Sequence, residues 1–296
     1  MIWAHAIRPD QPGAHCFTLS DSDTDNEQSP QTWQAVPTNP HIAFANTSRF
    51  SWTRASGSAY PVDSGLWTTC TESRELIQRR FKLTERDIKR TAGGFWRPPD
   101  DRPAITPFRA SNGERLRCLT HPKTDLFLLR PLGASPPIAG ETFGSRLSDP
   151  VGNFLVDQIG IDYDPRWSRT TPEPDEQLSQ RTMNFAIRAA SDQLLRAKTL
   201  WFVDYRIRRR PDIVPATEGR HQFYGNGCRF TDVREGDSGW DLDHVGDVFR
   251  FVAEQWQLKV DEYFASRNMP ADPFPQCRYS PNAMPEVRVL ACEAWC

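Results

Sequence analysis

The chain of 296 residues is long enough for one large domain or two modest ones, and long enough to bury a sizeable core. Its 36 basic and 38 acidic side chains give a net charge of -2, which argues against a nonspecific binder of polyanions or of anionic membranes. No apolar run approaches the roughly 20 residues that a membrane-spanning helix needs. Seven scattered cysteines, with no charged-then-apolar leader, predict reduced thiols and a cytoplasmic or nuclear location.

The first 130 residues predict helices and short strands in alternation. Residues 1–7 look like the last turns of an amphipathic helix, with Ile2 and Trp3 on its apolar face. A helix over 65–81 is predicted from apolar residues at helical spacing, namely Leu66, Trp67, Cys70, Ile77 and Phe81. Strands are expected at 14–19, 116–119 and 125–129, loops at 20–30 and 98–107.

A stretch rich in Pro, Gly and Ser at 131–150 is the best candidate for an internal linker. After it the pattern changes to a strand at 154–163, a helix at 176–198 and a strand at 200–207. Two strands joined by a helix of this length predict a right-handed crossover in which the strands are parallel. The aromatic and aliphatic run at 200–207 therefore indicates a central strand.

The ends of these two strands resemble each other in sequence. Asp162-Tyr163 closes the first strand and Asp204-Tyr205 the second. Two copies of one pattern are a weak indication of a repeated unit, as in stacks of the leucine-rich-repeat kind. No third copy is evident in the sequence.

The C-terminal third predicts a hairpin, a long helix and a last strand. Asn226-Gly227 is the tight turn of a hairpin over 223–230. A helix over 241–264 has Asp241 and Asp243 near its start, where negative charge suits the helix dipole. Its predicted apolar face consists of Val245, Val248, Phe249, Val252, Trp256, Val260, Tyr263 and Phe264. The last strand is expected at 286–291.

These segments together predict an α/β fold, with α+β as the alternative class. We expect a small, mixed and partly parallel sheet covered by helices. The expected organisation is an N-terminal region at 1–130, the linker at 131–150 and a C-terminal α/β region at 151–296. The two regions are alternatively one continuous domain.

The sequence contains few combinations of residues that could form a metal-binding or catalytic site. The cysteines offer only one short spacing, Cys292-x3-Cys296, whereas structural zinc needs four converging ligands. The acidic loop at 20–30 lacks the glycine and the bidentate glutamate of a calcium loop. We therefore expect no metal and no cofactor. Asp162 and Asp204 could face each other at the ends of adjacent strands, where α/β enzymes hold their sites, although pairing with water or arginine is the favoured interpretation.

A basic run, Arg206-Ile207-Arg208-Arg209-Arg210, follows the central strand. With Trp201 and Tyr205 nearby it could contact nucleic acid or act as a nuclear import signal. The slightly acidic chain favours a solvated strand end paired with nearby acids instead, so nucleic acid is the disfavoured partner.

Several segments resemble one family. Residues 1–9 resemble the segment that directly follows the first Glu-x-Arg motif of the fungal two-EXR, F-box-like proteins, and Cys70-Thr71-Glu72-Ser73-Arg74 resembles their second such motif. Residues 122–127, 200–206, 223–233 and Trp240 are similar to downstream segments of these proteins. The resemblance touches most of the chain, and residues 70–74 are its most specific part.

The resemblance implies a class of protein. F-box segments dock a ubiquitin-ligase adaptor, and Ile2, Trp3, Glu72 and Arg74 are the matching motif residues. The family's opening Leu-Pro-x-Glu-x-Arg segment is absent, because the chain begins at a methionine inside it, so half of the segment that docks the adaptor is missing. Glu72 and Arg74 lie two residues apart on a helix, so each must pair elsewhere, and a structural tie is favoured over chemistry.

Taken together, the sequence predicts a non-enzymatic intracellular interaction module that binds a protein partner. Asp204 and Arg206 are the predicted interaction residues at the end of the central strand. The alternative is an enzyme or small-ligand binder with a pocket at Asp162 and Asp204.

Overall fold

The computed structural model describes eleven stretches of the chain. They are residues 11–21, 33–37, 70–81, 104–109, 115–132, 156–168, 176–191, 197–213, 219–225, 227–266 and 284–294. The predicted helical turns at 1–7 and most of the acidic loop lie outside these residues.

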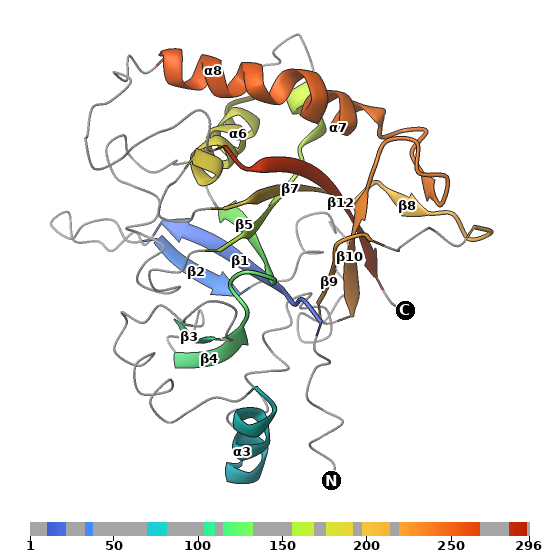
Figure 1. Cartoon of the computed structure of the whole chain (residues 1–296). Helices are drawn as coiled ribbons and strands as arrows, with labels where there is room; N and C mark the ends of the chain where they lie inside the picture. The colour runs from blue at the N-terminus through green and yellow to red at the C-terminus, as the bar shows by residue number, and fades with distance from the viewer. Residues whose placement is uncertain are drawn as a thin grey trace, which may run out of the picture.

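The fold is mixed α/β, and its main element is an eight-stranded sheet (Figure 1). In spatial order the strands are β2 (Trp33–Pro37), β1 (Ala14–Asp21), β5 (Leu126–Leu132), β6 (Gln158–Asp162), β7 (Thr199–Asp204), β12 (Glu286–Ala294), β10 (Cys228–Val233) and β9 (Gln222–Tyr224). The five strands from β1 to β12 in this order are parallel, and β2, β10 and β9 run antiparallel to their neighbours. The predicted central position of β7 and its parallel pairing with β6 are confirmed.

The sheet curls until its two sides meet. Gly13, just before β1, forms a parallel bridge with Tyr224 at the end of β9, and the Tyr224 N–H donates to the Pro12 carbonyl at 2.8 Å. This contact brings together strands near opposite ends of the spatial order, so the sheet is nearly a barrel. It also joins strands from both sides of the expected linker at 131–150 into one sheet.

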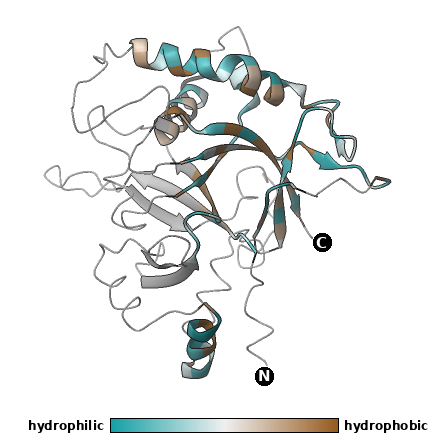
Figure 2. Ribbon diagram, viewed as in Figure 1, coloured by the Kyte–Doolittle hydropathy of each residue, from teal (hydrophilic) through white to brown (hydrophobic). Residues whose placement is uncertain are grey.

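Three helices cover the outside of the curled sheet (Figure 1). They are α6 (Glu176–Ser191), α7 (Gly246–Arg250) and α8 (Trp256–Ser266), the last two joined by the π-helical turn η2 (Phe251–Gln255). A short 3-10 helix, η1 (Pro165–Ser168), follows β6. The helix α3 (Thr71–Arg80) lies at the other end of the molecule and is coloured mostly as hydrophilic (Figure 2).

Two small ribbons accompany the main sheet. β3 (Ala104–Arg109) pairs with β4 (Arg115–Thr120), and β8 (Arg208–Arg209) pairs with β11 (Trp240–Asp241). The loop predicted at 98–107 is therefore wrong from residue 104 onward. Pro107 has no N–H to donate, but β3 pairs on one side only, with β4, and a strand at an edge tolerates proline.

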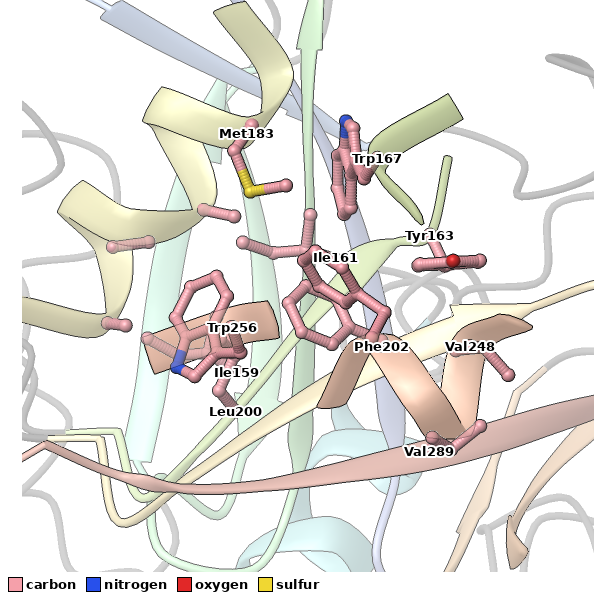
Figure 3. Close-up of a cluster of buried hydrophobic side chains, with 14 of the residues drawn as sticks. Ile159, Ile161, Tyr163, Trp167, Met183, Leu200, Phe202, Val248, Trp256 and Val289 are labelled. Atoms are coloured by element: carbon pink, nitrogen blue, oxygen red, sulfur yellow. The ribbon is translucent and has the colours of Figure 1, made fainter. Parts of the chain in front are cut away.

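Alternation along the strands divides the hydrophobic side chains into two cores. The outer core lies between the sheet and the three helices, and Figure 3 shows Phe202 of β7 there, close to Trp256 of α8 with ring centroids 5.3 Å apart. The inner core fills the concave side of the sheet, where Trp201, Phe223 and Phe230 are fully buried. Strand β7 contributes to both cores, because successive side chains point to opposite faces.

Two predicted helix starts are wrong for local reasons. The helix predicted over 241–264 begins at Gly246, because Trp240–Asp241 pairs with β8 as a strand. Asp247, rather than Asp241 or Asp243, occupies its first turn. Cys70 caps α3 instead of lying on its apolar face, and residues 65–69 lie outside the described part of the chain.

Candidate interaction site at the strand ends

The strand β7 ends in a turn that is fixed by its own last side chain. Asp204 is almost completely buried, and its Oδ1 accepts from the Arg206 N–H at 2.9 Å. The Arg206 guanidinium returns to the same carboxylate, with Nε 3.0 Å from Oδ1 and Nη2 2.6 Å from Oδ2. This turn replaces the next rungs of the ladder, which is why the predicted strand over 200–207 stops at residue 204.

Two more residues complete a network around Arg206. Nη2 also donates to both carboxylate oxygens of Asp247, at 2.9 and 3.0 Å. The Tyr163 hydroxyl donates to Asp247 at 3.3 Å, and the Arg206 Cζ lies 5.7 Å from the centre of the Tyr163 ring. We call Tyr163, Asp204, Arg206 and Asp247 the strand-end network.

Charge and burial shift the acidity of two members of the network. The hydrogen bonds from Arg206 to Asp204, followed by those to Asp247, raise the pKa of Arg206 above its ordinary value despite partial burial. Burial raises the pKa of the Tyr163 phenol, and the neighbouring Asp247 carboxylate adds to the increase. Arg206 therefore stays charged and Tyr163 stays a hydrogen-bond donor at neutral pH.

The neighbouring strand β6 is followed by the same turn. Asp164 accepts from the Arg166 N–H at 3.0 Å, and the Arg166 guanidinium binds it with Nη2 2.6 Å from Oδ2. Burial by itself raises the pKa of Asp164, but the hydrogen bonds from Arg166 outweigh it and hold that pKa below its ordinary value. Two adjacent parallel strands thus end in one local design, an aspartate that binds the arginine two residues later.

The structure does not bring Asp162 and Asp204 together. In the ladder Asp162 lies opposite Val203, whose side chain belongs to the inner core, and it accepts from the Tyr205 hydroxyl at 3.0 Å. Asp204, one residue further along β7, points to the opposite face. The resemblance in sequence misleads because the two Asp-Tyr pairs are offset by one position in the register.

The basic run after the strand lies among carboxylates. Arg209 lies 3.6 Å from Glu293, Arg210 lies 3.7 Å from Asp243, and Arg208 is opposite Asp241 in the β8–β11 ladder. The Arg209 and Arg210 pairs are long and both arginine side chains are exposed, so each pair contributes little to stability. They offset the positive charge that binding to a nucleic-acid backbone requires.

The motif residues of α3 lie on its exposed side. Glu72 and Arg74 are exposed, whereas Ser73 and Ile77 are buried. The Ser73 N–H donates to the Cys70 Sγ at 3.4 Å and the Cys70 N–H to the Ser73 Oγ at 3.2 Å, a reciprocal cap. Ile2 and Trp3, the other predicted motif residues, lie outside the described residues.

One buried polar cluster was not predicted. The Asp125 carboxylate accepts from the Gly13 N–H at 2.7 Å and from the His121 N–H at 2.8 Å, and it lies 2.9 Å from the Nε2 of His15. Asp125 and His15 are both completely buried. This cluster holds the start of β1 against β5. Gly13 and His15 are 110 or more residues away from Asp125, so no local pattern could have indicated that they meet it.

The described residues contain neither a metal-binding cluster nor a membrane-spanning helix. Within the described stretches, no group of three or more His, Cys, Asp or Glu side chains is arranged to hold a metal ion. Cys16, Cys228 and Cys292 are buried. Among the described helices, none combines the length and the apolar character needed to cross a bilayer.

Comparison with protein-family models, with curated proteins and with solved structures found no match. The likeness to the two-EXR proteins therefore stays a prediction that rests on the residues quoted above.

Proposed function

We propose that this chain is a non-enzymatic protein-interaction module whose binding surface is centred on the strand-end network. The proposal rests on one observation, that the aspartates at the strand ends are already bound by other side chains of the chain. In open α/β sheets, catalytic groups gather at the carboxyl ends of parallel strands. Here Asp162, Asp164 and Asp204 at those ends already bind a tyrosine or an arginine of the same chain.

The exposed part of the network has the chemistry of an interface residue. The Arg206 side chain is 37% exposed although one edge of its guanidinium is bound to buried Asp204. Arginine is enriched among the residues that dominate binding energy at protein interfaces, because its flat guanidinium combines directed hydrogen bonds with packing. A surface built around Arg206 suits a protein partner better than it suits a small substrate.

The F-box-like character is the second part of the proposal. Glu72 and Arg74 present a charged surface on α3, at the opposite end of the molecule from α8 (Figure 1). We assign this helix to contact with an adaptor of a ubiquitin ligase and the strand-end network to a second protein. The repeated aspartate–arginine turn after β6 and β7 supports a repeat-like organisation of the leucine-rich-repeat kind.

A site-specific photocrosslinker tests the surface without disturbing the network. Gly246 precedes Asp247, is exposed, and has no atom within 4 Å of an added Cβ. We expect a benzophenone amino acid at position 246 to capture a protein from lysate of the native cells, whereas the same group at Leu258, 60% exposed on α8, does not. Equal capture at both positions, or none at either, contradicts the proposal.

A thermal-shift screen tests the competing class of function. If the chain binds a small metabolite at the strand ends, a compound will raise the melting temperature, and Asp162→Asn will abolish the increase. We expect no compound that meets both conditions. A compound that does so would favour the enzyme or ligand-binding alternative.

A further inference from the structure

The Arg206 guanidinium has one edge, Nε and Nη2, bound within the chain, and a second edge, at Nη1, with no acceptor among the described residues. Nε and Nη2 are used by Asp204 and Asp247. Among the described residues, none accepts a hydrogen bond from Nη1, and the side chain is 37% exposed. Two N–H bonds of a charged group are therefore available at the strand ends to an acceptor from outside.

The charge around this edge selects the kind of acceptor. One guanidinium lies against two carboxylates, those of Asp204 and Asp247, so the local charge is 1 - 2 = -1. A phosphate or a carboxylate that approached Nη1 would meet two like charges across a short distance. A neutral oxygen meets no such repulsion and still receives a charge-assisted hydrogen bond.

The position of Arg206 is fixed before any partner arrives. Asp204 holds it through hydrogen bonds from Nε to Oδ1 and from Nη2 to Oδ2, and the Tyr163 ring lies beneath the guanidinium. A long side chain normally loses rotamer freedom when it binds. Since the network has already restricted Arg206, that cost is small at the moment of association.

We propose that Arg206 anchors a partner polypeptide by donating from Nη1 to a main-chain carbonyl oxygen. This inference rests on the proposed function and names the chemistry of the same surface. A carbonyl is the neutral acceptor that every residue of a polypeptide offers, whereas every nucleotide of a nucleic acid brings an anionic phosphate. The partner is therefore a protein segment whose main chain lies against the strand ends.

The experiment uses a phage-displayed random peptide library, selected on the immobilised full chain. Recovered peptides are measured against the wild type, Arg206→Lys and Arg166→Lys. Lysine keeps the positive charge beside the aspartate but loses the flat donor edge. Arg166 is the matched control, because it forms the same turn with Asp164 and is 36% exposed.

We expect Arg206→Lys to weaken peptide binding by about tenfold or more, and Arg166→Lys by about twofold or less. One amide-to-ester change in the peptide should weaken binding to the wild type but not to Arg206→Lys, since an ester carbonyl is a poorer acceptor. Peptides that bind equally well to Arg206→Lys overturn this inference while leaving the proposed function standing. A library that yields no binder contradicts both, and binding that collapses with salt, as for nucleic acid, overturns the carbonyl assignment.

Discussion

The burial of Trp201 could be predicted from the sequence, but its contacts could not. Its place in a run of aromatic and aliphatic residues predicts burial, and the side chain is completely buried. The sequence does not give the partner of its indole N–H, which donates to the Gln158 Oε1 at 2.7 Å. It also does not show that Gly160 lies opposite Trp201 in the β6–β7 ladder and that Leu126 and Leu128 pack closely against this glycine.

Gly160→Ala should therefore destabilise the inner core. An added Cβ would lie 3.1 Å from the Leu128 Cδ1 and 3.2 Å from the Leu126 Cδ1, and both leucines are fully buried. Overpacking of this kind costs about 1–3 kcal/mol of unfolding free energy, measurable by urea denaturation. Gly246→Ala is the control, because nothing lies within 4 Å of its added Cβ, and we expect it to be neutral or slightly stabilising. Equal effects of the two substitutions would contradict the packing described.

Cys70 should react as an unusually acidic thiol. Its side-chain and backbone hydrogen bonds to Ser73 lower its pKa from the ordinary value. A larger thiolate fraction at neutral pH speeds alkylation. We expect the pH midpoint of Cys70 alkylation, followed by peptide mass spectrometry, to lie below that of the same thiol in Ser73→Ala. Coincident midpoints would show that the Ser73 hydroxyl does not affect the thiol.

At the scale of elements, the regular α-helical spacing of hydrophobic residues does not predict all of the buried face of the long C-terminal helix. Spacings of three and four placed Val252 on the apolar face and left Phe251 out, but Phe251 is fully buried and Val252 only partly. The cause is the π-helical turn, which inserts one residue and allows Phe251 and Trp256 to reach the same side of the sheet. Both rings contact Phe202. No feature of the sequence distinguishes this turn from a continuous α-helix.

Deletion of Ala253 tests the origin of that turn. Ala253 is exposed, and its removal places Phe251 and Trp256 four residues apart, the spacing at which an α-helix keeps two side chains on one face. We expect a loss of about 1 kcal/mol or less by thermal unfolding. Deletion of buried Ala186 from the regular helix α6 rotates the rest of that helix by roughly 100° and should cost about 3 kcal/mol or more. A deletion of Ala253 as damaging as that of Ala186 would count against the π-helical turn.

At the scale of the whole molecule, a strand pairing can be predicted from the sequence only when the two strands lie close together along the chain. The β6–α6–β7 crossover and the β9–β10 hairpin are local, and the pattern of residues predicts both. The parallel pairing of β12 with β7, and of β1 with β5, joins segments that are far apart in the sequence. The spacing of hydrophobic residues within a segment does not indicate such a partner. For the same reason the sequence names only Asp204 and Arg206 among the four residues of the strand-end network, since Asp247 comes from α7 and Tyr163 directly follows β6.

Asp125→Asn should loosen the closure of the sheet. An amide can accept at only one of its two heavy atoms, so at least one buried N–H around Asp125 loses its acceptor. We expect a loss of about 3 kcal/mol in unfolding free energy, with faster hydrogen exchange at Gly13 and Tyr224, where the sheet closes. Asp241→Asn, at an exposed position, should change stability by less than about 0.5 kcal/mol. Unchanged exchange at Gly13 and Tyr224 would place the closure elsewhere.

Hydrogen–deuterium exchange on the crosslinker-identified complex, compared with the free chain, locates the binding surface. We expect protection at 163–168, at 205–207 and at 243–250, because these backbones surround the strand-end network. Protection confined to α3, to α8 or to the arginines of β8, with the strand ends exchanging as in the free chain, would contradict an interaction surface at the strand ends.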